Sequence, residues 1–313
     1  MSRYMMTCVV AMLVAPQTFR ADVAQLRIPA DACEVKLYVM VTPSHERYFN
    51  EWFLPTLQDK YELVVTRHEQ TRAGGVYMRG GWTEAVLKKV DMIIQAIEDN
   101  WGTVFIYSDV DIQFFQPTWP TIAAHINDFD MLAQNHGKNN TEVCTGFFAC
   151  IGNERTLRAW QAVRKRMRVV MEQGREVGDQ KSFNFVMQRD PDMLTLGVLP
   201  RTFMNGGVFA GKWWKPGMSL SIPKGIVLHH ANFVHSGDGR THEEVKIAQL
   251  AYVRERVNAS PELVSASAVG EVRPLKPILR SSKKGGSYPF NRSHSLRNSM
   301  ARSKLSSSAA SRI

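Results

Sequence analysis

Two aspartates separated by one residue, Asp109 and Asp111, come directly after an apolar segment of the chain. Alternate residues of an extended segment project to the same side, so we expect the two carboxylates to converge where that segment ends. Converging carboxylates are costly unless a cation neutralises them, and oxygen ligands suit Mg²⁺ or Mn²⁺. Such a cation could bridge the phosphates of a nucleotide diphosphate and stabilise a departing diphosphate. The alternative is a solvated acidic turn, because an Asp-x-Asp triplet alone is a weak signal.

Further polar residues follow at two later points in the chain. Asp179 and Gln180 come after Gly178 at the start of a predicted helix, where Asp179 either caps the helix or directs its carboxylate into a site. His230 ends a late apolar segment, and its imidazole could complete the coordination of the aspartate pair. The adjacent His229 leaves the choice between the two histidines open, although the His-x-Asn pattern favours His230.

Apolar segments that alternate with amphipathic ones must position these side chains. The expected strands are 36–42, 61–66, 103–107, 130–133, 146–151 and 226–230, the expected helices are 48–57, 82–97, 154–172, 180–188 and 243–257, and residues 72–81 form a glycine-rich loop. This alternation predicts an α/β fold, with a mainly parallel central sheet and helices on both faces. Ligands of such sheets bind at the carboxyl ends of the strands.

The charge of the 313-residue chain lies mostly near its end. The formal net charge is +10, of which residues 261–313 carry +8 and residues 1–260 only +2. The nearly neutral body gives no bulk electrostatic reason to bind nucleic acid. We therefore expect a globular domain over residues 31–257, followed by a basic, serine-rich and disordered tail over residues 258–313.

An apolar run over residues 5–15 lies in the N-terminal segment, residues 1–30. It is too short to span a bilayer, which needs about 20 residues. Its length suits the core of a secretory signal or a short membrane anchor, and a non-targeting segment is the alternative. If this run is a signal, the expected compartment is the Golgi or secretory lumen. If it is not, the expected compartment is the cytoplasm.

The four cysteines, Cys8, Cys33, Cys144 and Cys150, include no C-x-x-C pair. A zinc or thioredoxin-type site is therefore not expected. Cys144 and Cys150 flank an apolar run, which favours buried side chains that act as small hydrophobes.

Six short motifs occur in one order along the chain. They are Lys89-x-x-Met92-Ile93, Tyr107-Ser-Asp-Val-Asp-Ile112, Cys144-Thr-Gly-Phe147, Gly178-Asp-Gln-x-x-Phe-Asn184, Leu199-Pro200 with Phe203, and His230-Ala-Asn232. In this order they resemble the nucleotide-diphospho-sugar transferases of glycosyltransferase family 77 and its relatives, over about residues 36–250. The resemblance implies a GT-A (Rossmann-like) fold, a nucleotide-sugar donor such as a UDP-sugar, a divalent metal (Mn²⁺ or Mg²⁺), a glycan or glycoprotein acceptor, and retention of anomeric configuration.

The resemblance also implies roles around the donor. Asp111 and His230 would be direct metal ligands, while Asp109 would lie near the donor ribose and sugar and share the metal. Thr42 would lie near the nucleotide base, and Lys89 would face the donor from the helix before the Asp-x-Asp segment.

Five more residues take their roles from the same resemblance. Thr145 and Gly146 would border the donor sugar, where a glycine permits close backbone approach. Asp179 and Gln180 would lie near the anomeric carbon, so the acceptor hydroxyl either attacks from the front with help from the leaving phosphate, or Asp179 acts as nucleophile or cation stabiliser. Lys246 is a candidate phosphate contact, with a place in a helix interior as the alternative.

Two further questions stay open, which are the residues that bind the acceptor and the class of protein. Trp213 and Trp214 either stack on an acceptor sugar or pack in the core. A haloacid dehalogenase-type phosphatase also uses Asp-x-Asp after a strand, but near the N-terminus, and with Thr or Val where Gln113 stands here. A non-catalytic nucleotide- or carbohydrate-binding module is the other alternative. We predict a metal-dependent glycosyltransferase.

Overall fold

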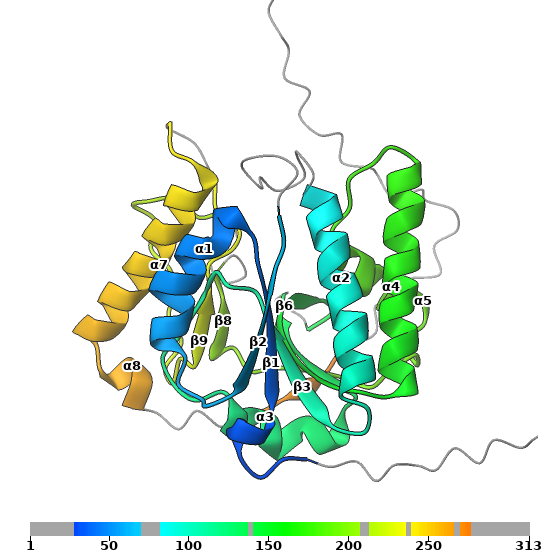
Figure 1. Ribbon diagram of the computed structural model, residues 1–313. Helices are drawn as coiled ribbons and strands as arrows, with labels where there is room; N and C mark the ends of the chain where they lie inside the picture. The colour runs from blue at the N-terminus through cyan, green and yellow to red at the C-terminus, as the bar shows by residue number, and fades with distance from the viewer. Residues whose placement is uncertain are drawn as a thin grey trace, which may run out of the picture. The chain divides into compact units, whose positions relative to one another are not determined.

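The computed structural model describes residues 28–69, 82–136, 140–206, 213–235, 239–265 and 270–276 (Figure 1). The apolar run 5–15, the expected loop 72–81 and the tail beyond residue 276 lie outside the described residues. Among the residues it does describe, no helix is both long and apolar enough to cross a membrane.

The described residues form a central sheet of seven strands in the order β10-β7-β5-β6-β3-β1-β2. The strands are β1 Lys36–Val41, β2 Glu62–Arg67, β3 Val104–Ser108, β5 Met131–Asn135, β6 Val143–Ile151, β7 Leu196–Val198 and β10 Arg273–Pro274. Five of them run in one direction, and only β6 and β10 run against it. The expected mainly parallel sheet is confirmed, with a reversed strand in its middle.

A second sheet lies beside the first and was not distinguished in the sequence. It consists of β4 (Ile112–Phe114), β9 (Leu228–His230) and β8 (Phe203–Asn205), in the order β4-β9-β8. The antiparallel pairing of β4 with β9 sets Ile112 opposite His230. The end of β9 is thereby held next to the segment that links β3 to β4.

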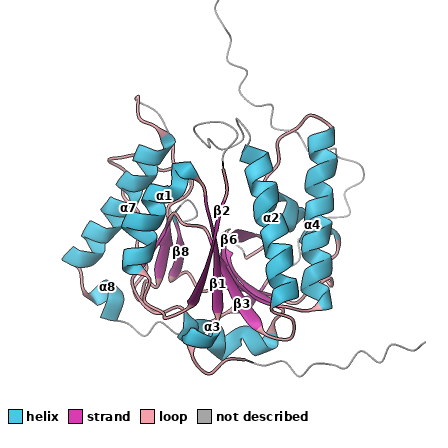
Figure 2. Ribbon diagram, in the orientation of Figure 1, coloured by secondary structure: helices cyan, strands magenta, loops and turns pink. Residues whose placement is uncertain are grey.

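Helices cover both faces of the central sheet (Figures 1 and 2). On one face lie α2 (Trp82–Asp99), α4 (Glu154–Glu172) and α5 (Asp179–Arg189); on the other lie α1 (Glu46–Tyr48), α3 (Trp119–His125) and α7 (His242–Ala259). Short 3-10 turns cover Ala32–Glu34, Pro43–His45 and Ile126–Asp128. The α/β class is confirmed, and the architecture agrees with the GT-A fold that the resemblance implies.

The segment expected as one helix over residues 48–57 is instead a composite. After α1 the backbone forms a π-helix over Phe49–Phe53 and a 3-10 turn over Leu54–Thr56. Pro55 has no amide hydrogen to donate, so it cannot support a regular α-helical last turn.

A row of stacked aromatic rings packs the helices against the sheet. Tyr107 on β3 stacks on Phe148 on β6 with ring centroids 5.3 Å apart, and Phe148 stacks on Trp160 on α4 at 5.4 Å. Trp160 in turn contacts Phe183 on α5 at 5.1 Å. These rings are buried and connect the strand that precedes Asp109 to the helix that begins at Asp179.

The folded part extends past residue 257, where we expected the tail to begin. A short helix, α8 (Glu262–Ser265), is held by hydrogen bonds from the Gly225 and Ile226 amides to the Leu263 carbonyl. Strand β10 then pairs with β7 at the edge of the central sheet. One helical turn and a two-residue strand are too short to produce a periodic pattern, so the expected boundary was wrong.

Candidate active site

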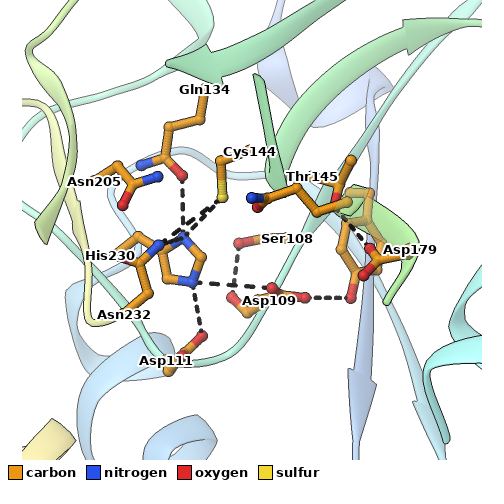
Figure 3. A network of polar contacts seen from close by, with 12 residues as sticks. Ser108, Asp109, Asp111, Gln134, Cys144, Thr145, Asp179, Asn205, His230 and Asn232 are labelled. Atoms are coloured by element: carbon orange, nitrogen blue, oxygen red, sulfur yellow. Dashed lines mark hydrogen bonds and ion pairs between the residues drawn. The ribbon is translucent and has the colours of Figure 1, made fainter. Parts of the chain in front are cut away.

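Asp109, Asp111 and His230 come together beyond the end of β3 (Figure 3). One ligand atom from each lies within 4.8 Å of the others, and His230 Nε2 lies 3.3 Å from Asp111 Oδ1 and 3.9 Å from Asp109 Oδ2. The side chains of Asp111 and His230 are buried, while that of Asp109 is 31% exposed. Two carboxylates and an imidazole at this spacing fit a divalent cation such as Mn²⁺ or Mg²⁺, reached from the side of Asp109.

Backbone hydrogen bonds hold the Asp-x-Asp segment between the two sheets. The Asp109 amide donates to the Gly146 carbonyl on β6 at 2.6 Å, and the Ala231 amide donates to the Asp111 carbonyl at 2.9 Å. The segment is thus fixed from one side by β6 and from the other by the end of β9. This explains why residues about 120 positions apart meet here.

The charges of the cluster are strongly coupled. Burial alone would raise the pKa of Asp111, but Lys246 and His230 lower it well below its usual range. Burial alone would lower the pKa of His230, but Asp111 raises it to about 10. The negative charge of Asp111 therefore stabilises positively charged groups next to it, which here are the Lys246 ammonium and the protonated His230 ring.

Gly146 lies directly under the imidazole of His230. A Cβ atom at this position would lie 2.2 Å from His230 Cε1 and 2.9 Å from Asp109 Oδ2. Only glycine permits this approach without a shift of the two proposed metal ligands. In the structure the close neighbours of this glycine are side chains of the cluster, and its place beside a donor sugar stays a prediction.

Lys89 joins the cluster to α5. Its Nζ lies 2.9 Å from Asp109 Oδ1, 2.9 Å from Asp179 Oδ2 and 3.1 Å from the Thr145 carbonyl oxygen. The side chain is buried, and although burial alone would lower its pKa, Asp109 and Asp179 raise it well above its usual range. The ammonium therefore stays charged between the two carboxylates.

Tyr107 also belongs to this side of the site and was not assigned a role from the sequence. Its hydroxyl donates to Asp109 Oδ1 at 2.6 Å, and Lys89 Nζ lies 4.6 Å from its ring centroid. Its position two residues before Asp109 on the same strand was the signal that could have indicated it.

Asp179 does not cap its helix, so that interpretation is wrong. The N-cap of α5 is Gly178, and Asp179 is the first helical residue. Its Oδ2 accepts a hydrogen bond from Thr145 Oγ1 at 2.7 Å, in addition to the contact with Lys89. Gln180, the next residue, has its Nε2 3.0 Å from Nδ1 of His136.

Lys246 and Thr42 approach the site from two other elements. Lys246 is part of α7, yet its Nζ contacts Asp111 Oδ2, so the side chain reaches the candidate site. Thr42 follows the carboxyl end of β1, and its hydroxyl lies 2.8 Å from His45 Nδ1.

The two neighbouring tryptophans have different environments. Trp214 is buried, donates from Nε1 to the Met218 carbonyl and packs against Tyr252. Stacking on an acceptor sugar is therefore wrong for Trp214, which serves the core. Trp213 is 49% exposed, with its ring centroid 5.6 Å from that of Phe233.

The polar surroundings of His230 Nδ1 were missed from the sequence. Gln134 Oε1 lies 3.1 Å from this nitrogen, the Asn232 amide 3.3 Å and Cys144 Sγ 3.6 Å. Cys144 and Cys150 are both buried, as expected. Burial alone would raise the pKa of Cys144, but His230 and His136 lower it to about 7. Cys144 is two residues before Gly146 on the same strand, which was the available signal.

The structure also resolves the choice between the adjacent histidines. His229 is fully buried, 3.1 Å from Gln113 Nε2 and 3.2 Å from Gln249 Oε1, and takes no part in the cluster. Burial and the charge of His230 lower its pKa to about 3, so it is neutral. His230 is the histidine that faces the aspartates.

Comparison with known proteins identifies the family. The family model for nucleotide-diphospho-sugar transferases matches residues 55–243, which include the three residues of the cluster. No curated protein matches the chain. Among solved structures, the chain is similar to a glycosyltransferase involved in the glycosylation of the major capsid of PBCV-1, with 12% identity, a TM-score of 0.46, and coverage of 70% of this chain and 98% of that chain.

The family match covers more than half of the chain and decides against the phosphatase alternative. It also favours an enzyme over a non-catalytic binding module. The chain belongs to the nucleotide-diphospho-sugar transferase family and is a glycosyltransferase.

Proposed function

We propose that this glycosyltransferase moves a sugar from a UDP-sugar to a hydroxyl group of a glycan or glycoprotein, with retention of configuration. In this proposal Asp109, Asp111 and His230 hold a divalent cation, Mn²⁺ or Mg²⁺. The observation that carries the proposal is the direct link, through Lys89, between this three-residue cluster and Asp179. One arrangement of side chains thus joins a diphosphate-binding position to a position for the reacting sugar.

The residues around the cluster divide between the two parts of the donor. A divalent cation, when bound, supplies positive charge that stabilises the departing diphosphate. Lys246, which contacts Asp111 Oδ2, adds a second positive group on the phosphate side. Thr42 at the end of β1 is the candidate contact for the base, and Thr145 with Gly146 borders the sugar.

Asp179 is better suited to orient Lys89 than to attack the sugar. Its Oδ2 receives both the Lys89 ammonium and the Thr145 hydroxyl, and a paired carboxylate is a weak nucleophile. This supports front-face attack, in which the acceptor oxygen bonds to the anomeric carbon as the bond to the phosphate oxygen breaks. The acceptor proton then passes to the leaving phosphate.

A series of aromatic rings that begins beside Gln180 could bind the acceptor sugar. Gln180 contacts His136, whose ring centroid lies 5.1 Å from that of Phe233, and Phe233 contacts the exposed Trp213. Phe233 has a positive φ of 51°, an uncommon conformation for an aromatic residue. Exposed aromatic faces stack on sugar rings, so Trp213 is our candidate acceptor contact.

A donor panel tests this proposal. The full chain is incubated with MnCl₂ and individual UDP-, GDP- and CMP-sugars, and release of free nucleotide is followed by chromatography. We expect turnover of a UDP-sugar that stops when EDTA is added, and a product with the donor's anomeric configuration. An inverted product would overturn the front-face mechanism, and the absence of turnover with every donor would overturn the proposed function.

A further inference from the structure

We propose that Gln134 is a positioning residue that fixes the tautomer of His230 and thereby aims its Nε2 at the cation position. This inference rests on the metal site of the proposed function. It concerns a fully buried glutamine on β5 that contacts His230 but not the aspartates in the described network (Figure 3).

The orientation of the Gln134 amide is set by the backbone. Its Nε2 donates to the carbonyl oxygens of Phe203 at 3.2 Å and Met204 at 3.0 Å. A flipped amide would place its oxygen against these two oxygens and leave both contacts without a hydrogen. Oε1 must therefore be the atom that faces His230 Nδ1, at 3.1 Å.

The tautomer of His230 follows from this orientation. A carboxamide oxygen only accepts hydrogen bonds, so Nδ1 of His230 carries the hydrogen in this contact. The lone pair of the neutral ring is then on Nε2, the nitrogen that faces Asp111 and Asp109. Metal-binding histidines are generally oriented by such a contact of their second nitrogen.

Two more side chains, Cys144 and Asn232, approach the same Nδ1. Cys144 Sγ at 3.6 Å is a weak acceptor and suits this hydrogen. Asn232 Nδ2 lies 3.3 Å from Nδ1, and this amide has to turn over to present its oxygen to the same hydrogen. The register between β5 and β6 shifts after Ala133 and sets Gln134 opposite Cys144. This irregularity brings both side chains to the same edge of the imidazole.

The neighbouring His229 provides an internal comparison. Gln113 Nε2 donates to the Leu250 carbonyl at 2.9 Å and lies 3.1 Å from His229 Nδ1, so that Nδ1 is an acceptor. The hydrogen of His229 is then on Nε2, which faces Gln249 Oε1 at 3.2 Å. Two adjacent histidines therefore carry opposite tautomers, each set by the orientation of a buried glutamine.

The two similar glutamine–histidine contacts supply a matched pair of variants, Gln134→Met and Gln113→Met. Each removes one buried amide beside one histidine, and both should lower the melting temperature. Affinity for Mn²⁺ is measured without donor, from the electron paramagnetic resonance signal of the free ion, below the melting temperature of either variant. We expect Q134M to bind Mn²⁺ about 10- to 100-fold more weakly than wild type, and Q113M to stay within about 3-fold of it.

Nitrogen-15 spectra of the histidine rings report the tautomers directly, in the Mg²⁺-loaded protein. We expect a protonated Nδ1 for His230 and an unprotonated Nδ1 for His229. An unprotonated Nδ1 in His230, or equal loss of Mn²⁺ affinity in both variants, would overturn the positioning role of Gln134. Either result would leave the proposed metal site itself standing. A wild-type chain that binds neither ion would overturn the metal site itself, and this inference with it.

Discussion

The ammonium of Lys89 lies 2.9 Å from Asp179 Oδ2, and both side chains are at most 10% exposed. The same ammonium also lies 2.9 Å from Asp109 Oδ1. One buried cation therefore compensates two carboxylates, one directly after β3 and one at the start of α5, so Lys89 is the charge that joins these two elements.

Lys89→Met should strongly destabilise the fold, because it leaves the buried Asp179 carboxylate without its partner. Removal of one member of a buried pair costs about 3–5 kcal/mol in the free energy of unfolding. Denaturant titration measures this loss, with Lys88→Met at the exposed neighbouring position as the control. The double variant K89M/D179N should recover part of the stability, and a K89M variant as stable as K88M would contradict the pairing.

Mn²⁺ should raise the melting temperature of the chain, because a ligand that binds only the folded state stabilises it. At a concentration 100 times its dissociation constant the gain is about 2.7 kcal/mol. Differential scanning fluorimetry with and without MnCl₂ measures the shift, and Asp111→Asn should abolish it. A shift of equal size in D111N would place the ion elsewhere.

Gly146→Ala should weaken the cation site even though it adds only one methyl group. The new Cβ would meet His230 Cε1 at 2.2 Å, so the imidazole must move away from the aspartates. We expect at least about a 10-fold loss of Mn²⁺ affinity, by the general sensitivity of metal sites to ligand orientation. Gly152→Ala also introduces a clash, with the backbone oxygen of Asn100 at 2.2 Å, but should leave the Mn²⁺ affinity of the folded protein intact.

Trp213→Ala should raise the KM for the acceptor and leave hydrolysis of the donor in the absence of acceptor unchanged. The loss of one stacked aromatic ring corresponds to about 0.5–1.5 kcal/mol, or roughly 2- to 12-fold in KM. Trp101 is 51% exposed and is not among the residues of the site, so Trp101→Ala is the matched control. Equal effects of the two variants on the acceptor KM would exclude Trp213 from acceptor binding.

The cation cluster was accessible from the sequence because its signals are local. Asp109 and Asp111 follow a fully buried strand, and His230 ends another one. The apolar face of α2 was equally readable, since Val86, Val90, Ile93, Ile94 and Ile97 are all buried as their spacing predicts. The order of the short motifs then linked these local signals to one family.

The rest of the site depends on pairings that no single segment encodes. Strands β4, β7 and β8 have three residues each, too few for a periodic pattern, yet β4 and β8 flank the strand that carries His230. Gln134 faces His230 because of a shift in register between two strands, and Cys144 reaches it for the same reason. Such contacts arise from tertiary structure and could not be predicted from spacing along the chain.

The most direct test of the account is Mn²⁺-dependent release of UDP from a UDP-sugar by three forms of the chain, which are wild type, D111N and D91N. Asp91 on α2 is a partly exposed aspartate paired with Arg164 on α4, outside the cluster, so D91N controls for the loss of one carboxylate. We predict that wild type and D91N release UDP at similar rates and that D111N loses at least about 100-fold, since a charge-stabilising group of this kind is worth 10²–10³ in rate. Equal rates for D111N and D91N would contradict the assignment of this cluster as the catalytic metal site.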